Sequence, residues 1–311
     1  MIVTLTPNPS LDRTLEIDKL VRGEVVRSRA VRAEPGGKGV NVSRALLNNH
    51  RRTRAVLPIG GPEGDHIASL LEALGLETSR VPIDAPVRTN VSLVEPDGTV
   101  TKINAPGPQL TPDELDALNK TTIASLDGAA WVAACGALPP GAPADLYARL
   151  TRDVHAAGVR IAVDTSGAPL TAVIAARPDV LKPNAEELAA LTGANLTTFG
   201  DVVAAAEEVR GAGVLAVLVS LGRHGAVLVD KSGAVHAESP PVIPKSNVGA
   251  GDATLAGFLA GGGVGPDALR TAVAWGTAAV RLPGTAMPGP EDIDVSAMNI
   301  DTVNPDRQLG E

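Results

Sequence analysis

The sequence predicts an α/β protein: a mostly parallel, Rossmann-like sheet flanked by helices. Two observations predict this class. Short runs rich in β-branched residues alternate with longer Ala- and Leu-rich segments along most of the 311 residues, which is the usual alternation of strands and helices in such folds. The short runs are also continuously apolar, as expected of strands that are covered on both faces.

Each expected strand is a short apolar run, and each expected helix is a longer segment with helical periodicity. The strands are expected at residues 2–6, 54–58, 130–134, 160–164, 179–181 and 215–220. The helices are expected at residues 40–49, 65–74, 112–125, 144–157, 185–191, 202–211, 252–260 and 266–280. Two of these helices begin at clear N-cap signals, Thr111 before Asp113 and Glu114, and Asn184 before Glu187.

Two stretches, residues 13–34 and 87–104, instead alternate apolar and polar residues like half-exposed antiparallel strands. The second contains Pro96-Asp97-Gly98, a turn signal. We expect them to form a small β-sheet lid inserted in a single domain that spans residues 1–311. The alternative is two surface hairpins without a role. The tail from about Met287 is polar and rich in Pro and Asp, and we expect it to be partly disordered.

Composition excludes several classes of protein. The net charge of −8 argues against a general nucleic-acid binder, which needs a basic face. Cys135 is the only cysteine, so no intramolecular disulfide can form. The first twelve residues lack the apolar run of a signal peptide, and no stretch approaches the length of a membrane span. We therefore expect a cytoplasmic protein without a membrane partner.

The most informative segment is NVGAGDATLAGF, at residues 247–258. Gly249, Ala250 and Gly251 open an apolar helix, and small residues there allow backbone N–H groups to form an anion hole at the helix N-terminus. Asp252 follows at once, where its carboxylate can remove a hydroxyl proton beside a bound phosphate. The alternative is a glycine turn followed by an ordinary N-terminal helix acid.

A second segment, EPGGKGVNVSRAL at residues 34–46, combines a glycine turn with polar side chains. Gly36 and Gly37 permit close approach of the backbone to a ligand, Lys38 adds a cation, and Asn41 can bind sugar hydroxyls. The segment is not a Walker loop, because Gly39 follows Lys38 where Ser or Thr is required. The alternative is a helix-entry turn with a solvated lysine.

The third segment, LKPNAEEL at residues 181–188, follows a short strand. Lys182, Asn184 and Glu187 would lie at the carboxyl end of that strand, where open α/β sheets bind ligands. Asn184 and Glu187 could hold Mg²⁺ through water, since Mg²⁺ prefers oxygen ligands and keeps several waters. The alternative is a capped surface helix with an exposed acid.

The fourth segment, SLGRHG at residues 220–225, also follows a buried strand. Ser220, Gly222 and Gly225 can bring the backbone close to a nucleotide. His224 is interpreted as a loop residue. The remaining histidines are scattered without partners at metal spacing, so no zinc site is expected.

These four segments, in this order, resemble the pfkB (ribokinase-like) family of carbohydrate kinases, and the resemblance covers nearly the whole chain, from TPNPSLD at residues 6–12 onward. It implies ATP and Mg²⁺ as cofactors, with Asp252 as catalytic base, Gly249, Ala250 and Gly251 as anion hole, and Glu187 acting on Mg²⁺. It further implies that Lys182, Asn184, Ser220, Gly222 and Gly225 bind the nucleotide. Asp12, Gly36, Gly37 and Asn41 would hold the sugar. The loop at residues 246–248 is a candidate for binding K⁺, as in some relatives.

Within the family, TPNPSLDRT, the lysine of PGGKG, RTN at residues 88–90 and KINAPGP at residues 102–108 look most like members that phosphorylate fructose 1-phosphate at its 6-hydroxyl. Lys38 and Arg88, with Asn90 beside it, would suit a substrate that already carries phosphate. Arg27 is either a third cation of this group or a solvated surface residue. Ala137 stands where relatives usually carry Ser, which leaves the sugar phosphate open.

Three other interpretations stay open. Two are kinases of the same family that act on tagatose 6-phosphate or fructose 6-phosphate, and the third is a sugar-phosphate sensor without catalysis. Exposed apolar lid residues such as Val25, Val91 and Leu93 are compatible with a homodimer through the lid.

Overall fold

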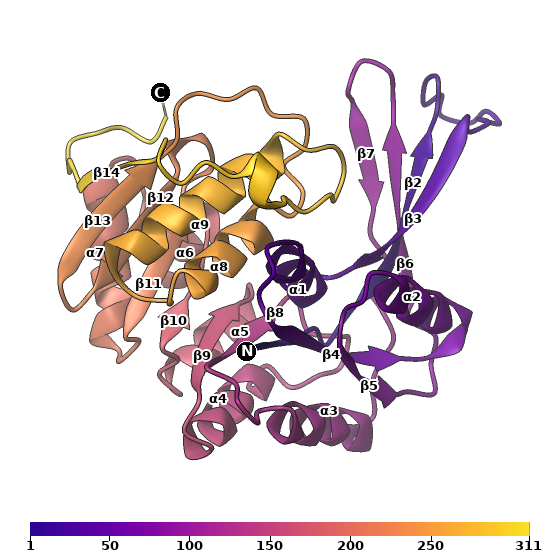
Figure 1. Cartoon of the computed structure of the whole chain (residues 1–311), viewed down its shortest axis with the longest axis horizontal. Helices are drawn as coiled ribbons and strands as arrows, with labels where there is room; N and C mark the ends of the chain where they lie inside the picture. The colour runs from indigo at the N-terminus through magenta and orange to yellow at the C-terminus, as the bar shows by residue number, and fades with distance from the viewer. Residues whose placement is uncertain (311) are drawn as a thin grey trace.

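Residues 1–310 are described in a computed structural model of the chain, which contains two β-sheets of different size (Figure 1). The larger sheet has ten strands and the smaller has four. The strands of the larger sheet are β1 (Ile2–Leu5), β4 (Thr53–Ile59), β5 (Thr78–Pro82), β8 (Trp131–Cys135), β9 (Arg160–Asp164), β10 (Val180–Leu181), β11 (Ala216–Ser220), β12 (Ala226–Asp230), β13 (Gly233–Glu238) and β14 (Asn299–Thr302).

The larger sheet has the strand order β14-β13-β12-β11-β10-β9-β8-β1-β4-β5. From β5 to β11 each strand pairs with its neighbour in parallel, and β12, β13 and β14 extend the sheet in antiparallel fashion. Parallel strands have their carboxyl ends at one edge of the sheet, so the loops that follow them converge there.

Helices cover both faces of this sheet. They are α1 (Lys38–Asn48), α2 (Gly61–Ala73), α3 (Pro112–Ala124), α4 (Leu146–Ala156), α5 (Ala168–Ile174), α6 (Ala185–Thr192), α7 (Phe199–Gly211), α8 (Ala250–Ala260) and α9 (Gly265–Val280), with 3₁₀ turns η1 (Gly222–His224) and η2 (Pro290–Asp292). None of the helices within residues 1–310 combines the length and the apolar character needed to cross a bilayer.

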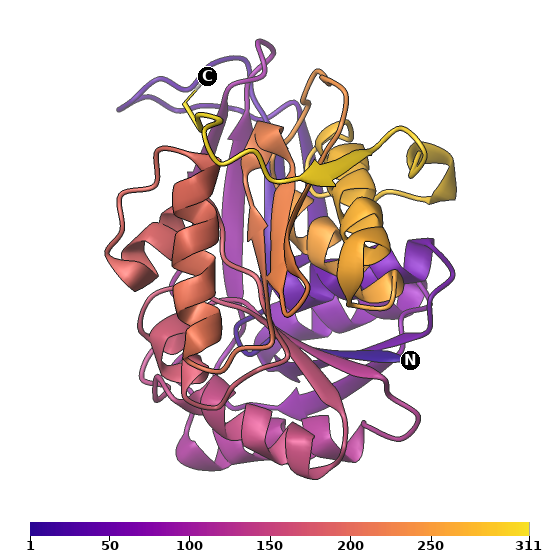
Figure 2. The same cartoon turned by 90° about the vertical axis from the view of Figure 1, so that its left-hand side faces the viewer.

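Alternate residues of the strands belong to two separate cores. Ile161 and Val163 of β9 pack in the core formed with α2 to α7, whereas Ala162 packs in the core formed with α1, α8 and α9. Figure 2 shows the salmon α7 and the yellow-orange α9 on opposite sides of the orange strands. The continuous apolar strands predicted from the sequence therefore do face helices on both sides.

The smaller sheet projects from the helices near α1 and α2 (Figure 1). Its strands are β2 (Ser10–Glu16), β3 (Ala30–Gly36), β6 (Arg88–Val94) and β7 (Val100–Ile103), in the order β3-β2-β6-β7. They come from the two stretches that alternate in the sequence, although β2 starts three residues earlier, at Ser10. The central pair, β2 and β6, is parallel and not antiparallel as expected, whereas each of the two strands is antiparallel to its own hairpin partner on the other side.

One expectation about the chain end was wrong. The segment after Met287 is ordered and not loose: β14 adds an edge strand to β13, and the side chains of Met287 and Met298 are buried. Its polar composition concealed these long-range contacts. The strands β5, β12, β13 and β14 and the helix α5 were also not predicted, whereas every expected strand and helix is present with boundaries shifted by about one helical turn at most.

Candidate active site

The site lies at the carboxyl edge of the parallel strands, where the expected motifs converge. Asp164 ends β9, Lys182 directly follows β10, and Ser220 ends β11. The first turn of α8 and the start of α1 contribute the remaining site residues, and both helices pack on the same face of the larger sheet. Open α/β sheets bind ligands at such positions.

Asp252 lies in the first turn of α8 and is only 6% exposed. Its Oδ2 accepts a hydrogen bond of 2.8 Å from Nδ2 of Asn41, a residue 211 positions earlier in the chain. The segments at residues 34–46 and 247–258 are therefore in direct contact. This is expected if Asp252 is a base and Asn41 supplies an amide that binds a hydroxyl.

The turn before Asp252 can form an anion site. Gly249 caps α8 in the left-handed region, at φ 77°, a conformation that favours glycine. A Cβ added at Gly251 would lie 3.5 Å from Nζ of Lys182. The ammonium of Lys182 is thus next to the free amides of the helix N-terminus, and both favour a negative group.

Asp164 is a central residue that sequence reasoning missed. It is 1% exposed, its Oδ1 accepts a 2.6 Å hydrogen bond from Nζ of Lys38, and its Oδ2 is 2.8 Å from Nζ of Lys182. The Lys182 contact lacks hydrogen-bond geometry and is best described as an ion pair. An Asp that ends a buried strand at the carboxyl edge was the signal that could have identified it.

Burial raises the pKa of Asp252 to about 6, and the negative charge of Asp164 contributes in the same direction. The Asn41 hydrogen bond and the two lysines, Lys38 and Lys182, oppose this rise. For Asp164 burial also favours the neutral form, but the two lysines outweigh it and hold its pKa below the usual value. One carboxylate is therefore a permanent counter-ion, and the other has the proton affinity of a general base.

Lys38 is held differently from the solvated lysine of the alternative interpretation. Burial disfavours its charge, but the carboxylate of Asp164 outweighs burial and raises the pKa of the ammonium. Asp252 and Glu187 add smaller contributions in the same direction. Lys38 therefore interacts with the charges of three acids, of which Asp164 alone is in direct contact with it.

Asp12 and Asn90 meet on the polar face of the smaller sheet. Oδ1 of Asp12 accepts hydrogen bonds from Nδ2 of Asn90 at 3.0 Å and from Oγ of Ser10 at 2.6 Å. A Cβ at Gly36 would overlap the Asp12 carboxylate, so glycine is required for this approach. Burial raises the pKa of Asp12. Gly37, at φ 115°, follows Gly36 and caps α1.

Arg88 holds backbone in place. Its Nη1 donates to the carbonyl of Ala105 and its Nη2 to that of Asn8, both at 2.9 Å, and its Nε donates to Pro9 at 3.4 Å. These bonds tie the loop after β1 to the segment after β7. A contact between Arg88 and a substrate stays a prediction. Arg27 lies exposed in the loop between β2 and β3, not on a strand as expected.

Asn184 and Glu187 form a reciprocal capping box at the start of α6. The Asn184 side chain accepts from the Glu187 N–H at 2.8 Å, and Oε2 of Glu187 accepts from the Asn184 N–H at 2.9 Å. No hydrogen bond reaches Oε1 of Glu187 from residues 1–310. The same residues contain no group of three or more acidic, His or Cys side chains that could enclose a metal.

A cavity of about 1060 Å³ extends from the α8 turn along α9. The predicted residues Ser220, Gly222, Gly225, Ala250 and Gly251 line it, whereas Lys182 and Asn184 do not. Sequence reasoning missed the part of the wall that comes from segments without a recognisable motif, which includes Glu238, Pro240, Pro241, Val242, Val273, Gly276, Thr277, Val280 and Arg307.

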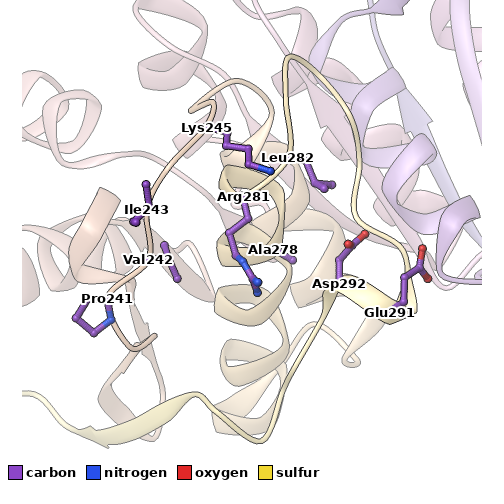
Figure 3. A pocket seen from close by; sticks show the side chains of 9 residues that line it. All are labelled: Pro241, Val242, Ile243, Lys245, Ala278, Arg281, Leu282, Glu291 and Asp292. Carbon is purple, nitrogen blue, oxygen red and sulfur yellow. The ribbon is translucent and has the colours of Figure 1, made fainter. Parts of the chain in front are cut away.

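A second cavity, of about 630 Å³, lies over the last turn of α9 and contains none of the predicted residues. Figure 3 shows Ala278 and Arg281 on the helix at its centre, the loop with Lys245 on one side, and Glu291 on the other.

The sequence profile described as "pfkB family carbohydrate kinase" matches residues 7–292. The chain belongs to the pfkB family of carbohydrate kinases. The predicted family and the predicted enzyme class, a phosphotransferase acting on carbohydrate, are thereby confirmed.

Named relatives of this kinase match over nearly their whole lengths. A 1-phosphofructokinase of Rhodobacter capsulatus is 37% identical, with 96% of each chain covered. The ATP-dependent 6-phosphofructokinase isozyme 2 of Escherichia coli is 34% identical, covering 94% of this chain and 96% of its own. The crystal structure of phosphofructokinase-2 from Escherichia coli in complex with potassium superposes with a TM-score of 0.89 at 34% identity, with the same coverage. The fold class predicted for this kinase is confirmed by that superposition.

Proposed function

We propose that this kinase transfers the γ-phosphoryl group of ATP to the 6-hydroxyl of fructose 1-phosphate, which gives fructose 1,6-bisphosphate. The observation that carries the chemistry is the buried Asp252, with its raised pKa, next to the N-terminal amides of α8 and bonded to Asn41. The similarity to 1-phosphofructokinase supports the choice of sugar phosphate.

In this proposal Asp252 accepts the proton of the attacking 6-hydroxyl, and Asn41 fixes the direction of its carboxylate. The amides of Gly249 to Gly251 and the ammonium of Lys182 stabilise the negative charge of the phosphoryl group in the transition state of its transfer. Asp164 keeps Lys38 charged, and its ion pairs hold Lys38 and Lys182 in position. Asp12 and Asn90, already bonded to each other, would bind sugar hydroxyls from the lid side.

Mg²⁺ fits the site only as a hydrated ion, because a cage of acidic ligands is missing from residues 1–310. Oε1 of Glu187 could hold one of its waters, while the phosphates of ATP supply the remaining ligands. When bound, the ion would neutralise charge on the phosphates.

The loop at residues 246–248 is the candidate for binding K⁺. Oγ of Ser246 donates to the Gly284 carbonyl at 2.8 Å, which joins this loop to the turn after α9. The crystal structure of the Escherichia coli relative in complex with potassium supports the proposal that this kinase binds K⁺. A cytoplasmic location stays a prediction.

The strand register of the smaller sheet gives it two faces of different polarity. Paired residues share a face, so Asp12, Asn90 and Lys102 belong to the polar one. The opposite face carries Val31 and Ile103, which are 57% and 59% exposed, together with Leu15, Val91 and Leu93. We propose that the polar face closes over the sugar phosphate and that the apolar face pairs with a second copy of the chain.

The experiment that tests the proposed function is a comparison of kcat/KM for fructose 1-phosphate, fructose 6-phosphate and tagatose 6-phosphate, with ATP in excess. We expect the highest value for fructose 1-phosphate. The similarity to the Escherichia coli 6-phosphofructokinase makes fructose 6-phosphate the second candidate, and a higher value for it would overturn our assignment. Nucleotide binding without turnover of any of the three would indicate the sensor.

A further inference from the structure

The end of the chain reaches the nucleotide cavity. After β14 the chain crosses the start of α7, where the Phe199 N–H donates to the Arg307 carbonyl and the Leu309 N–H donates to the Thr197 carbonyl, both at 2.9 Å. This path brings the side chain of Arg307 into the wall of the 1060 Å³ cavity. Arg307 is therefore part of the cavity wall.

The side chain of Arg307 is fixed on two sides. Its Nη2 donates to Oε2 of Glu238 at 2.6 Å, and its guanidinium lies 4.8 Å from the ring centre of the fully buried Phe199. Stacking on an aromatic ring and a hydrogen-bonded ion pair together restrict the rotamers of an arginine. Arg307 can thus hold the Glu238 carboxylate in one orientation.

The glycine turn of the nucleotide site is attached to the same segment. Nε2 of His224 donates to the Leu309 carbonyl at 3.1 Å, and Nε2 of His236 donates to the His224 carbonyl at 2.7 Å. Gly222 and Gly225, on either side, line the cavity together with Glu238 and Arg307. The chain end, the turn and the Glu238 carboxylate therefore form one connected wall.

One carboxylate oxygen of Glu238 is available to accept a hydrogen bond. The hydrogen bond from Arg307 lowers the pKa of Glu238, so its carboxylate is ionised at neutral pH. Within residues 1–310 no side chain or backbone group donates to its Oε1. The same cavity is also lined by Val242, Val273 and Val280, whose apolar side chains suit a base. A polar acceptor beside an apolar slot suits the hydroxyls of a ribose.

We propose that Glu238 binds the ribose hydroxyls of the nucleotide and that Arg307 is the positioning residue that holds Glu238 for this contact. The inference rests on the proposed use of ATP, and it adds the chain end to the nucleotide site.

The test compares ATP with 2′-deoxy-ATP and 3′-deoxy-ATP as phosphoryl donors at saturating fructose 1-phosphate. The wild type should show a KM that is about tenfold or more higher for at least one deoxynucleotide, as expected for a lost hydrogen bond to a charged group. In Glu238→Ala and Arg307→Ala the KM for ATP should rise. The ratio of the KM for the deoxynucleotide to the KM for ATP should then fall to about two or less. The KM for fructose 1-phosphate should stay unchanged.

Arg54→Ala is the matched control. Arg54 pairs with Glu77 at 2.9 Å and has a side-chain exposure of 36%, close to the 35% of Arg307, but it lies on β4, next to the edge strand β5 at the opposite end of the larger sheet. This variant should keep the wild-type ratio, because a general loss of stability does not distinguish ribose from deoxyribose.

Either of two results overturns the inference: a wild-type ratio near one for both deoxynucleotides, or an unchanged ratio in Glu238→Ala. The dissociation constants of ATP and the two analogues, measured by calorimetry on the same proteins, give the ratio without turnover. A wild type that prefers ATP in calorimetry but phosphorylates none of the sugar phosphates would refute the proposed reaction and leave the ribose contact standing.

Discussion

At the scale of single residues, Asp252 and Asp164 are both buried carboxylates, but only Asp164 has two lysines within ion-pair distance. Asp252 has the amide of Asn41 instead. If Asp252 is the base, Asp252→Asn should lower kcat by a factor of about 10² or more, with little change in ATP affinity. Steady-state kinetics and calorimetry check this.

Asp267→Asn is the control for this variant, because Asp267 lies in the first turn of α9 as Asp252 does in α8, but it is exposed. It should have wild-type activity. An active Asp252→Asn enzyme would refute the role of Asp252.

The pH dependence of the reaction follows from the pKa of Asp252, which burial raises to about 6. The base must be ionised, so kcat/KM should be constant at neutral pH. Below about pH 6 it should fall about tenfold for each pH unit. A profile of kcat/KM between pH 5 and 8 would show this limb. A break near pH 4 would mean that the carboxylate is not desolvated.

The same pKa predicts an effect on stability. Because the pKa of Asp252 is higher in the folded than in the unfolded protein, the folded state binds the proton more tightly. Ionising Asp252 therefore costs stability as pH rises from about 4 to about 6, and the full cost remains above pH 6. At pH 7.5 the Asp252→Asn protein should have a higher Tm than the wild type. A lower Tm would show that the charge stabilises the lysine cluster instead.

At the scale of elements, the chain contains three helices with the same reciprocal capping box: Thr111–Glu114 in α3, Asn184–Glu187 in α6 and Thr198–Asp201 in α7. Of the three, only the one in α6 directly follows a parallel strand, β10, and has an acid, Glu187, whose charge acts on Lys38. Local sequence explains why all three form, and position in the fold explains why one can also serve a ligand.

This comparison gives a test for the magnesium role of Glu187. Glu187→Gln and Glu114→Gln should each weaken a cap and lower stability by about 1 kcal/mol or less. Only Glu187→Gln should raise the Mg²⁺ concentration needed for half-maximal rate, by about tenfold or more. Equal Mg²⁺ dependence in the two variants would leave Glu187 with a capping role alone.

At the scale of the whole molecule, the smaller sheet exposes an apolar face on one side and presents Asp12 and Asn90 on the other. If the apolar face pairs two chains, the double variant Val31→Asp and Ile103→Asp should be monomeric in sedimentation. Val264→Asp is the control. Val264 is 62% exposed like the two lid residues, but it lies outside the smaller sheet, at the N-cap of α9. A double variant with unchanged mass in solution would exclude this interface.

Much of the site could be predicted because its parts are local signals. Glycines before Asp252, the glycine turn before Lys38 and the Asn184–Glu187 cap are each readable within a few residues. What these residues touch could not be read. Lys38 pairs with Asp164, and Arg88 binds three backbone carbonyls. That either side chain also contacts a substrate phosphate stays a prediction.

By itself, the sequence determined the alternation of strands and helices, the two stretches of the smaller sheet, the four motifs and their family, because periodicity and turn glycines act over a few residues. Only the tertiary structure decided that Asn41 contacts Asp252, that Asp164 joins two lysines, and that Arg307 reaches the nucleotide cavity. Except for the pair of Lys182 with Asp164, these contacts join residues more than 60 positions apart. Their partners are selected by the order of strands in the sheet, which no local pattern encodes.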